Sequence, residues 1–151
     1  MGVKGYREWC AEVDRIVADV GKTEWLYEAC EFVRREASNR APMRTGALKS
    51  SIDYEVRSSD KNITEGVIFT DLPYATFVEF GTGPVGRDNH DGISPNVNAQ
   101  WSDEPWVTTL NGISFLNFGQ PAQPFLYPAL ADNIDKVMDI ARVGLDEALK
   151  G

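Results

Sequence analysis

Apolar residues in the first forty positions recur in a helical period. Between 6 and 20 they appear every three or four residues, which predicts an amphipathic helix carrying Tyr6, Trp9, Cys10, Val13, Ile16, Val17 and Val20 on one face. The same period continues over 23–39 through Leu26, Ala29, Cys30, Val33 and Ala37. Gly21 separates the two stretches and Thr23 can cap the second, so the pattern fits either one bent helix or two. Pro42 ends the helical run, because a proline disfavours helical backbone in the residue before it.

The next segment alternates in the period of a strand. Ile52, Tyr54 and Val56 fall on one face of residues 51–58, with charged residues between them. A polar turn at 60–62 and a second alternating run at 63–70 predict an antiparallel hairpin. A second hairpin is predicted over 106–109 and 114–118, because Asn-Gly at 111–112 is a strong signal for a two-residue turn.

Two segments lie between and after these hairpins. Residues 74–80 are short and apolar, and their spacing fits either a single helical turn or a strand. Residues 84–105 are rich in Gly, Pro, Asn and Asp and predict a long loop of the kind that is often functional. Pro128 suits the first turn of a last helix, whose stripe is formed by Leu130, Ile134, Val137, Met138, Ala141, Leu145 and Leu149.

The order of elements predicts the fold class. Helix, hairpin, loop, hairpin and helix indicate an α+β fold, in which an antiparallel sheet of two hairpins packs against a long N-terminal helical region and a C-terminal helix. The length of 151 residues fits a single domain over 1–151 with one long loop at about 84–105.

Composition narrows the possible functions. The net charge of −8 argues against a DNA-binding surface, which needs a basic face, although acidic groups could line a channel through which DNA passes. No apolar run approaches the roughly 20 residues of a membrane span, and the polar N-terminus has no secretory signal. Cys10 and Cys30 are too few for a disulfide framework and are expected to be small buried residues in a reducing cytoplasm.

One glycine-rich stretch has the spacing of a nucleotide-binding loop. Residues Gly81 to Gly86 match G-x-G-x-x-G, but that motif must open a helix whose N-terminal N–H groups hold the pyrophosphate. Pro84 and the polar residues after it favour a loop instead, so we expect no cofactor here. A small ligand- or nucleotide-binding domain that uses this loop remains the alternative function.

The polar loop contains other candidate chemistry. Asp88, His90 and Asp91 offer metal ligands but miss the calcium-loop pattern, and no metalloenzyme spacing surrounds the single histidine. No G-x-S-x-G nucleophile elbow is present, so we expect no catalytic residues and no metal.

Four tryptophans divide into two groups. Trp9 and Trp25 fall on helix faces and are expected in the core. Trp101 and Trp106 lie in or beside the polar loop, where they either pack back on their own domain or anchor a protein partner. With Asp88 and Asp91 they form the candidate partner interface.

Three sequence motifs occur in order along the chain. Residues 41–52 read A-P-x-x-T-G-x-L-x-x-S-I, residues 74–82 read Y-A-x-x-V-E-F-G-T, and residues 119–130 read G-Q-x-A-x-P-F-L-x-P-A-L. Together they resemble the tail-completion, or head–tail joining, proteins found in the neck of long-tailed double-stranded DNA bacteriophages and prophages. The region from Pro84 to Phe118 is long for that family. The motif residues expected to matter for structure are Pro42, Thr45, Gly46, Leu48, Tyr74, Glu79, Gly81, Thr82, Gly119, Gln120, Pro124, Phe125 and Pro128.

The resemblance implies a virion structural protein and not an enzyme. Its partners would be the head connector or adaptor, the tail terminator or tail tube, and other copies of itself in a ring that the tail environment suggests is sixfold. Genomic DNA would pass through without sequence-specific binding, no membrane would be involved, and assembly would take place in the bacterial cytoplasm. The other alternative is a regulator outside the virion that reuses the fold.

One charged residue stands in an apolar motif. Glu79 is expected either on an exposed face or in an ion pair with Arg44 that would lock the first two motifs together.

Overall fold

The computed structural model describes residues 24–44, 46–58 and 63–150. The predicted helix at 6–20, Gly21, Thr23, Trp9 and Cys10 lie outside these residues, as do Thr45 and the turn at 60–62. In chain order the helices are α2 (Glu24–Arg40), α3 (Ala47–Ser51), α4 (Ala75–Phe80), α5 (Gly83–Asp88), α6 (Leu126–Ala131) and α7 (Ile134–Lys150). The strands are β1 (Asp53–Ser58), β2 (Thr64–Phe69), β3 (Trp106–Leu110) and β4 (Ile113–Asn117).

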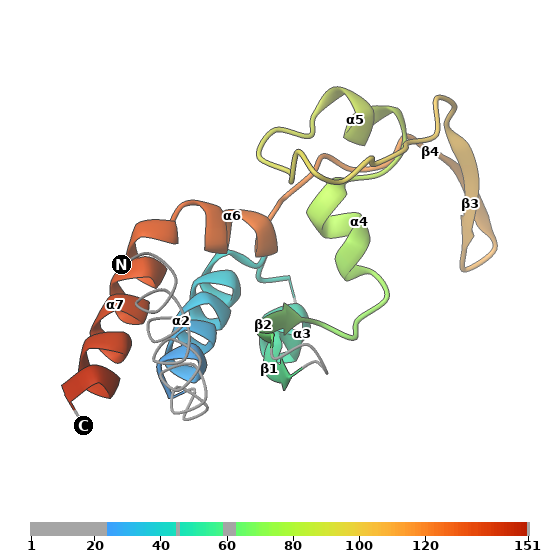
Figure 1. Cartoon of the computed structure of the whole chain (residues 1–151). Helices are drawn as coiled ribbons and strands as arrows, with labels where there is room; N and C mark the ends of the chain where they lie inside the picture. The colour runs from blue at the N-terminus through green and yellow to red at the C-terminus, as the bar shows by residue number, and fades with distance from the viewer. Residues whose placement is uncertain (1–23, 45, 59–62, 151) are drawn as a thin grey trace.

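The α+β fold class is confirmed, with one difference in the sheet. The two hairpins form separate two-stranded antiparallel sheets, β1 with β2 and β3 with β4, and do not join into one. The first hairpin packs on α2, which contacts both of its strands, whereas β3 and β4 extend away from the helices at one side of the molecule (Figure 1). The alternating pattern of each hairpin fixed its internal pairing but gave no information on whether the two would meet.

Helix α2 is the centre of the packed part of the molecule. It contacts α3, β1, β2, α6 and α7, and its predicted apolar residues Ala29, Cys30, Val33 and Ala37 are buried (Figure 1). Gly66 of β2 lies against Cys30, and a Cβ at that glycine would overlap the cysteine Sγ. A glycine inside a strand allows another element to approach closely, which here lets β2 lie directly on α2.

The C-terminal helix differs from its prediction. Instead of one helix beginning near Pro128, α6 ends at Ala131 and α7 begins at Ile134. Asn133 Nδ2 donates to the Ala129 carbonyl at 2.9 Å, and Asp132 accepts from Arg40 of α2 at 2.9 Å. Polar side chains that bond to nearby backbone compete with helix continuation, which explains the break. The predicted stripe is partly solvent-exposed, since Leu130, Ile134, Met138, Leu145 and Leu149 are all exposed.

Trp25 packs where α2 meets α7. A Cβ at Gly144 would overlap its side chain, so the two helices are in close contact at this point. The residue is half-buried and is not part of the hydrophobic core cluster, where we expected it. None of the helices in the described ranges is long and apolar enough to cross a membrane.

Candidate functional site

The three sequence motifs meet in one hydrophobic core. The first motif contributes Ala41, Leu48 and Ile52, the second contributes Ala75, and the third contributes Phe125 and Ala129, all packed with Val33 and Ala37 of α2. Phe125 has no exposed surface. Burying a large apolar side chain stabilises a fold by about 1.5–3 kcal/mol, so the apolar motif residues serve first to build the scaffold.

Glu79 connects the second motif to the third, which corrects both expectations for it. Its side chain is neither exposed nor paired with Arg44, because the residue is only 5% exposed and Arg44 lies on the surface. Oε2 of Glu79 accepts from the backbone N–H of Phe125 at 2.8 Å and of Leu126 at 3.0 Å, and Oε1 accepts from Tyr127 at 3.0 Å. These three donors stand at the N-terminus of α6, where backbone N–H groups have no partner within the helix and favour a negative charge.

A second set of bonds ties α4 to the strand-like segment before α6. Thr82 and Gln120 form an isolated antiparallel bridge, with Thr82 N donating to Gln120 O at 2.9 Å and Gln120 N to Thr82 O at 3.1 Å. The Gln120 side chain donates to the Phe77 carbonyl at 2.9 Å, and Gln123 N donates to the Val78 carbonyl at 2.8 Å. The second and third motifs are therefore joined at several points, from Phe77 to Thr82 in the second motif.

Two motif glycines are required by this contact. Gly81 has φ +74°, and a Cβ there would lie 2.7 Å from Ala122 N and 2.8 Å from Gln120 O. Gly119 has φ +89°, and its Cβ would overlap the Thr82 carbonyl. Positive φ and a backbone neighbour both exclude other residues, so the glycines set how closely the two motif segments approach.

The remaining motif residues are partly exposed beside this joint. Gly46 has a positive φ of +75° and precedes α3. A groove of about 690 Å³ borders the first two motifs and is lined by Pro42, Met43, Arg44, Leu48, Tyr74, Phe77, Val78, Gln120 and Gln123. Pro124 and Pro128 flank Phe125 on the approach to and in the first turn of α6. The lining of this groove carries one charged side chain and several exposed apolar ones, which suits a protein partner.

Residues 75–80 and 83–88 are helical, which decides one open alternative and corrects one prediction. The segment 74–80, left open between helix and strand, forms α4. Gly83–Asp88 forms α5, where we predicted loop, because a proline in the first helical turn needs no N–H partner and is compatible with a helix start. The G-x-G-x-x-G stretch therefore does open a helix, but that helix is only one and a half turns long and follows α4 instead of a strand. The strand–turn–helix context of a dinucleotide site is absent from these described residues.

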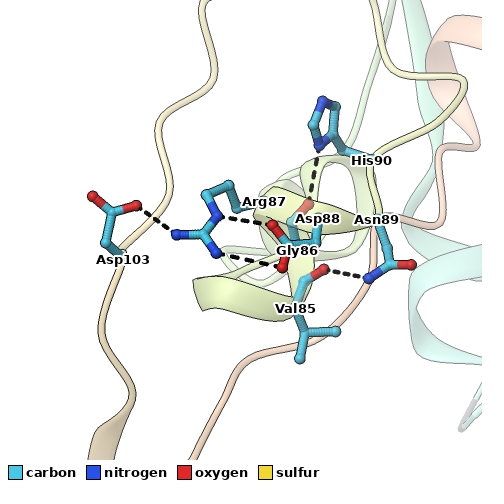
Figure 2. Close-up of polar contacts among 7 residues, drawn as sticks. All are labelled: Val85, Gly86, Arg87, Asp88, Asn89, His90 and Asp103. Carbon is cyan, nitrogen blue, oxygen red and sulfur yellow. Dashed lines mark hydrogen bonds and ion pairs between the residues drawn. The ribbon is translucent and has the colours of Figure 1, made fainter.

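The end of α5 carries a small network of charges (Figure 2). Arg87 donates to Asp88 and to Asp103, each at 2.9 Å, and so ties the helix to the loop before β3. The two carboxylates raise the pKa of the Arg87 guanidinium, and Arg87 lowers the pKa of Asp88. All three side chains are exposed, so these pairs contribute little to stability.

Trp101 packs back on its own chain. Its Nε1 donates to the Phe80 carbonyl at 2.9 Å, and its ring stacks on His90 with centroids 4.5 Å apart. Nδ1 of His90 lies 3.3 Å from the Gly86 carbonyl (Figure 2). His90 is thus held between α5 and Trp101, while Asp88 and Asp91 are exposed. Within the described ranges no three His, Cys, Asp or Glu side chains gather to hold a metal ion.

Trp106 leads into the most exposed apolar part of the described chain. It begins β3, is 39% exposed, and borders a groove of about 700 Å³ that Phe77, Phe80 and Trp101 also line. The rest of the hairpin carries six further exposed apolar side chains: Val107, Leu110, Ile113, Phe115, Leu116 and Phe118. Of the four predicted interface residues, Trp106 is thus the one that belongs to a continuous apolar surface.

Sequence reasoning missed this surface although a signal was available. From Pro105 to Ala131 the chain contains no Asp, Glu, Lys, Arg or His, in a protein of which 25% is charged. The role of Arg87 was also missed, because its partner Asp103 is distant in sequence and lies in a segment without helix or strand.

Comparison with known proteins agrees with the sequence motifs. Residues 11–81 match the family model described as "Bacteriophage HK97-gp10, putative tail-component". The match covers the first motif and nearly all of the second, and it stops before the third. Neither a curated protein nor a solved structure matches the chain. Residues 11–81 are therefore similar to the HK97-gp10-like family of bacteriophage tail components, in agreement with the phage family that the sequence motifs resemble.

Proposed function

We propose that this tail component completes the phage tail or joins it to the head connector, as a ring of identical subunits around the DNA channel. The single observation that carries the proposal is the family match over residues 11–81. The motifs that go beyond this match extend the resemblance to neck proteins through residue 130.

The geometry of the motif residues supports binding instead of catalysis. Glu79 is the one carboxylate inside the motifs, and its two oxygens accept hydrogen bonds from three backbone N–H groups. The motif glycines Gly81 and Gly119 lie against backbone atoms, so their role is to let two segments approach closely. The exposed apolar motif residues Met43, Tyr74 and Phe77 line a groove in which Arg44 is the one charged side chain. Surfaces of this kind bury against other proteins, with aromatic residues as anchors.

The proposed partners follow from position in the neck. One face of the ring would meet the head connector or adaptor, and the other the tail terminator or tail tube. Contacts between subunits related by rotation are heterologous and close on themselves. With a net charge of −8, the inner surface would repel phosphate, so genomic DNA would pass without sequence-specific binding. Assembly would take place in the host cytoplasm and the product would reside in the virion.

Electron microscopy of particles made without this gene product tests the proposal. Lysates in which the gene is disrupted should contain DNA-filled heads separate from free tails, and a plasmid copy of the gene should restore joined particles. The length of the free tails and the shape of their ends would distinguish a role in completing the tail from a role in joining it to the head. Normal joined virions in the disrupted lysate would exclude a neck role.

A further inference from the structure

The β3–β4 hairpin has properties that a solvated hairpin lacks. Its strands pair only with each other among the described residues, and neither makes an extensive contact with a helix or another strand (Figure 1). An isolated two-stranded hairpin is at best marginally stable in water, because it has no surface on which to bury its apolar side chains. The β3–β4 hairpin extends from the molecule, so a surface that buries its apolar side chains would have to come from a partner.

Both faces of the hairpin carry exposed apolar side chains. The pairing places Trp106, Leu110, Ile113 and Phe115 on one face, and Val107 and Leu116 with the polar Thr109 and Ser114 on the other. Val107 is 67% exposed and Ile113 is 69% exposed. A hairpin that only covered its own domain would be apolar on one face and polar on the other, so the second face indicates a contact outside the chain.

Both long edges of the hairpin are also unpaired in the part of the chain that the structure describes. The outer edge of β3 and the outer edge of β4 offer free backbone groups, and neither strand carries the charged residue or proline that usually protects an edge from pairing. The two edges are different, so adding the β3 edge of one copy to the β4 edge of the next gives a head-to-tail contact that repeats. Repeated head-to-tail contacts form a ring when the rotation between neighbouring copies closes, and an open filament when it does not.

The distribution of charge favours a second copy of this chain as the partner. Two copies that each carry −8 repel one another wherever acidic surfaces meet. The hairpin lies within the uncharged run 105–131, and the groove at its base is lined only by uncharged residues. This region therefore lets two copies approach without bringing like charges together.

We infer that β3–β4 hairpins of neighbouring copies pair edge to edge, β3 against β4, and form the continuous belt that holds the ring together. The ring itself rests on the proposed function. The groove lined by Phe77, Phe80, Trp101 and Trp106 lies at the root of each hairpin and would receive apolar side chains of the adjacent one.

Cysteine cross-linking between separately tagged chains tests the pairing. The background carries Cys10→Ser and Cys30→Ala. One chain carries Val107→Cys or Thr109→Cys, and the other carries Ser114→Cys or Leu116→Cys, all on the same face. The single substitutions prevent a disulfide within one hairpin. Mixed chains should give the heterotypic β3–β4 disulfide, both in purified protein at high concentration and in complemented particles. Only homotypic β3–β3 or β4–β4 products, or none, would overturn the inference.

Val107→Lys supplies an independent measure, with Ile63→Lys as the matched control. Both residues are exposed, at 67% and 57%, and lie in or beside different hairpins, so both variants should keep the wild-type melting temperature. Each lysine reduces the net negative charge equally and so favours association elsewhere. Val107→Lys should lower the assembled fraction at least tenfold by sedimentation, while Ile63→Lys should not.

The two proposals fail in distinguishable ways. If the chain is in the particle neck but Val107→Lys supports infectious particles and no β3–β4 cross-link forms, the neck function stands and the hairpin pairing is wrong. If the chain is absent from particles, the neck function is wrong, and the cross-link in purified protein alone decides the pairing.

Discussion

The carboxylate of Glu79 accepts the backbone N–H of Phe125 at 2.8 Å, in the interior of the protein. The same oxygen accepts from Leu126, and the other oxygen accepts from Tyr127. A side chain in α4 thus caps α6, and the bond holds Phe125 in the core that all three motifs share.

Glu79→Gln should destabilise the protein. The amide keeps one acceptor oxygen but turns an NH₂ group toward a backbone N–H, and it removes the charge that α6 favours. Hydrogen bonds to charged groups contribute about 1.5–3 kcal/mol, so we expect a loss of about 2–3 kcal/mol and a melting temperature lower by roughly 4–10 °C. Differential scanning calorimetry measures the change in melting temperature. Glu104→Gln, an exposed carboxylate, is the control and should have no effect. Equal melting temperatures for the two variants would contradict the capping role.

Arg44→Ala should leave stability unchanged to within about 0.5 kcal/mol. Arg44 is exposed and does not pair with Glu79, so its removal breaks no buried contact. Chemical denaturation of the variant beside Glu79→Gln measures the difference. A loss as large as that of Glu79→Gln would restore the ion pair expected from the sequence.

Gly119→Ala should cost more than Gly46→Ala. Both glycines have positive φ, which costs a non-glycine residue about 1–2 kcal/mol. A Cβ at Gly46 meets nothing within 4 Å, whereas a Cβ at Gly119 overlaps the Thr82 carbonyl. The difference in unfolding free energy between the two variants isolates the contact between α4 and the third motif. Equal unfolding free energies for Gly119→Ala and Gly46→Ala would show that the contact between Thr82 and Gly119 does not contribute to stability.

Cys30 should react slowly with thiol reagents. The residue is buried against Gly66, and burial raises the pKa of its thiol, so a smaller fraction is thiolate at pH 8 than in an exposed cysteine. Because the thiolate is the nucleophile, the rate should rise with pH and rise sharply on unfolding. Disulfide-exchange kinetics of the Cys10→Ser variant, native and in denaturant, test this. A native rate equal to the denatured one would place Cys30 at the surface.

The elements that could be predicted from the sequence are those set by the spacing of neighbouring residues. Apolar spacing predicted α2 and both hairpins, and Asn-Gly predicted the turn, where Asn111 and Gly112 take φ of 53° and 81°. Pro84 misled the prediction of α5, because a proline begins a helix as readily as it ends one.

The candidate site depended on contacts that no local pattern contains. The partners of Glu79 are backbone N–H groups 46, 47 and 48 residues away. Because almost every residue carries the same backbone N–H group, the sequence does not mark these three as partners. Arg44, a visible cation, was the natural but wrong partner. Trp101 likewise donates to a backbone carbonyl, that of Phe80. The sequence therefore could not show whether this tryptophan packs on its own chain or on a partner.

The shared core also limits how this protein can be divided. The family match ends at Gly81, yet Phe125 and Ala129, which fill the core beneath Leu48, Ile52 and Ala75, come from beyond residue 120. A fragment that stopped where the match stops would leave the Glu79 carboxylate without its three donors and Leu48 and Ile52 uncovered. The boundary of the recognisable sequence is therefore not a boundary of folding, and exchange of this segment between related chains preserves a stable protein only when its distant C-terminal counterpart is exchanged with it.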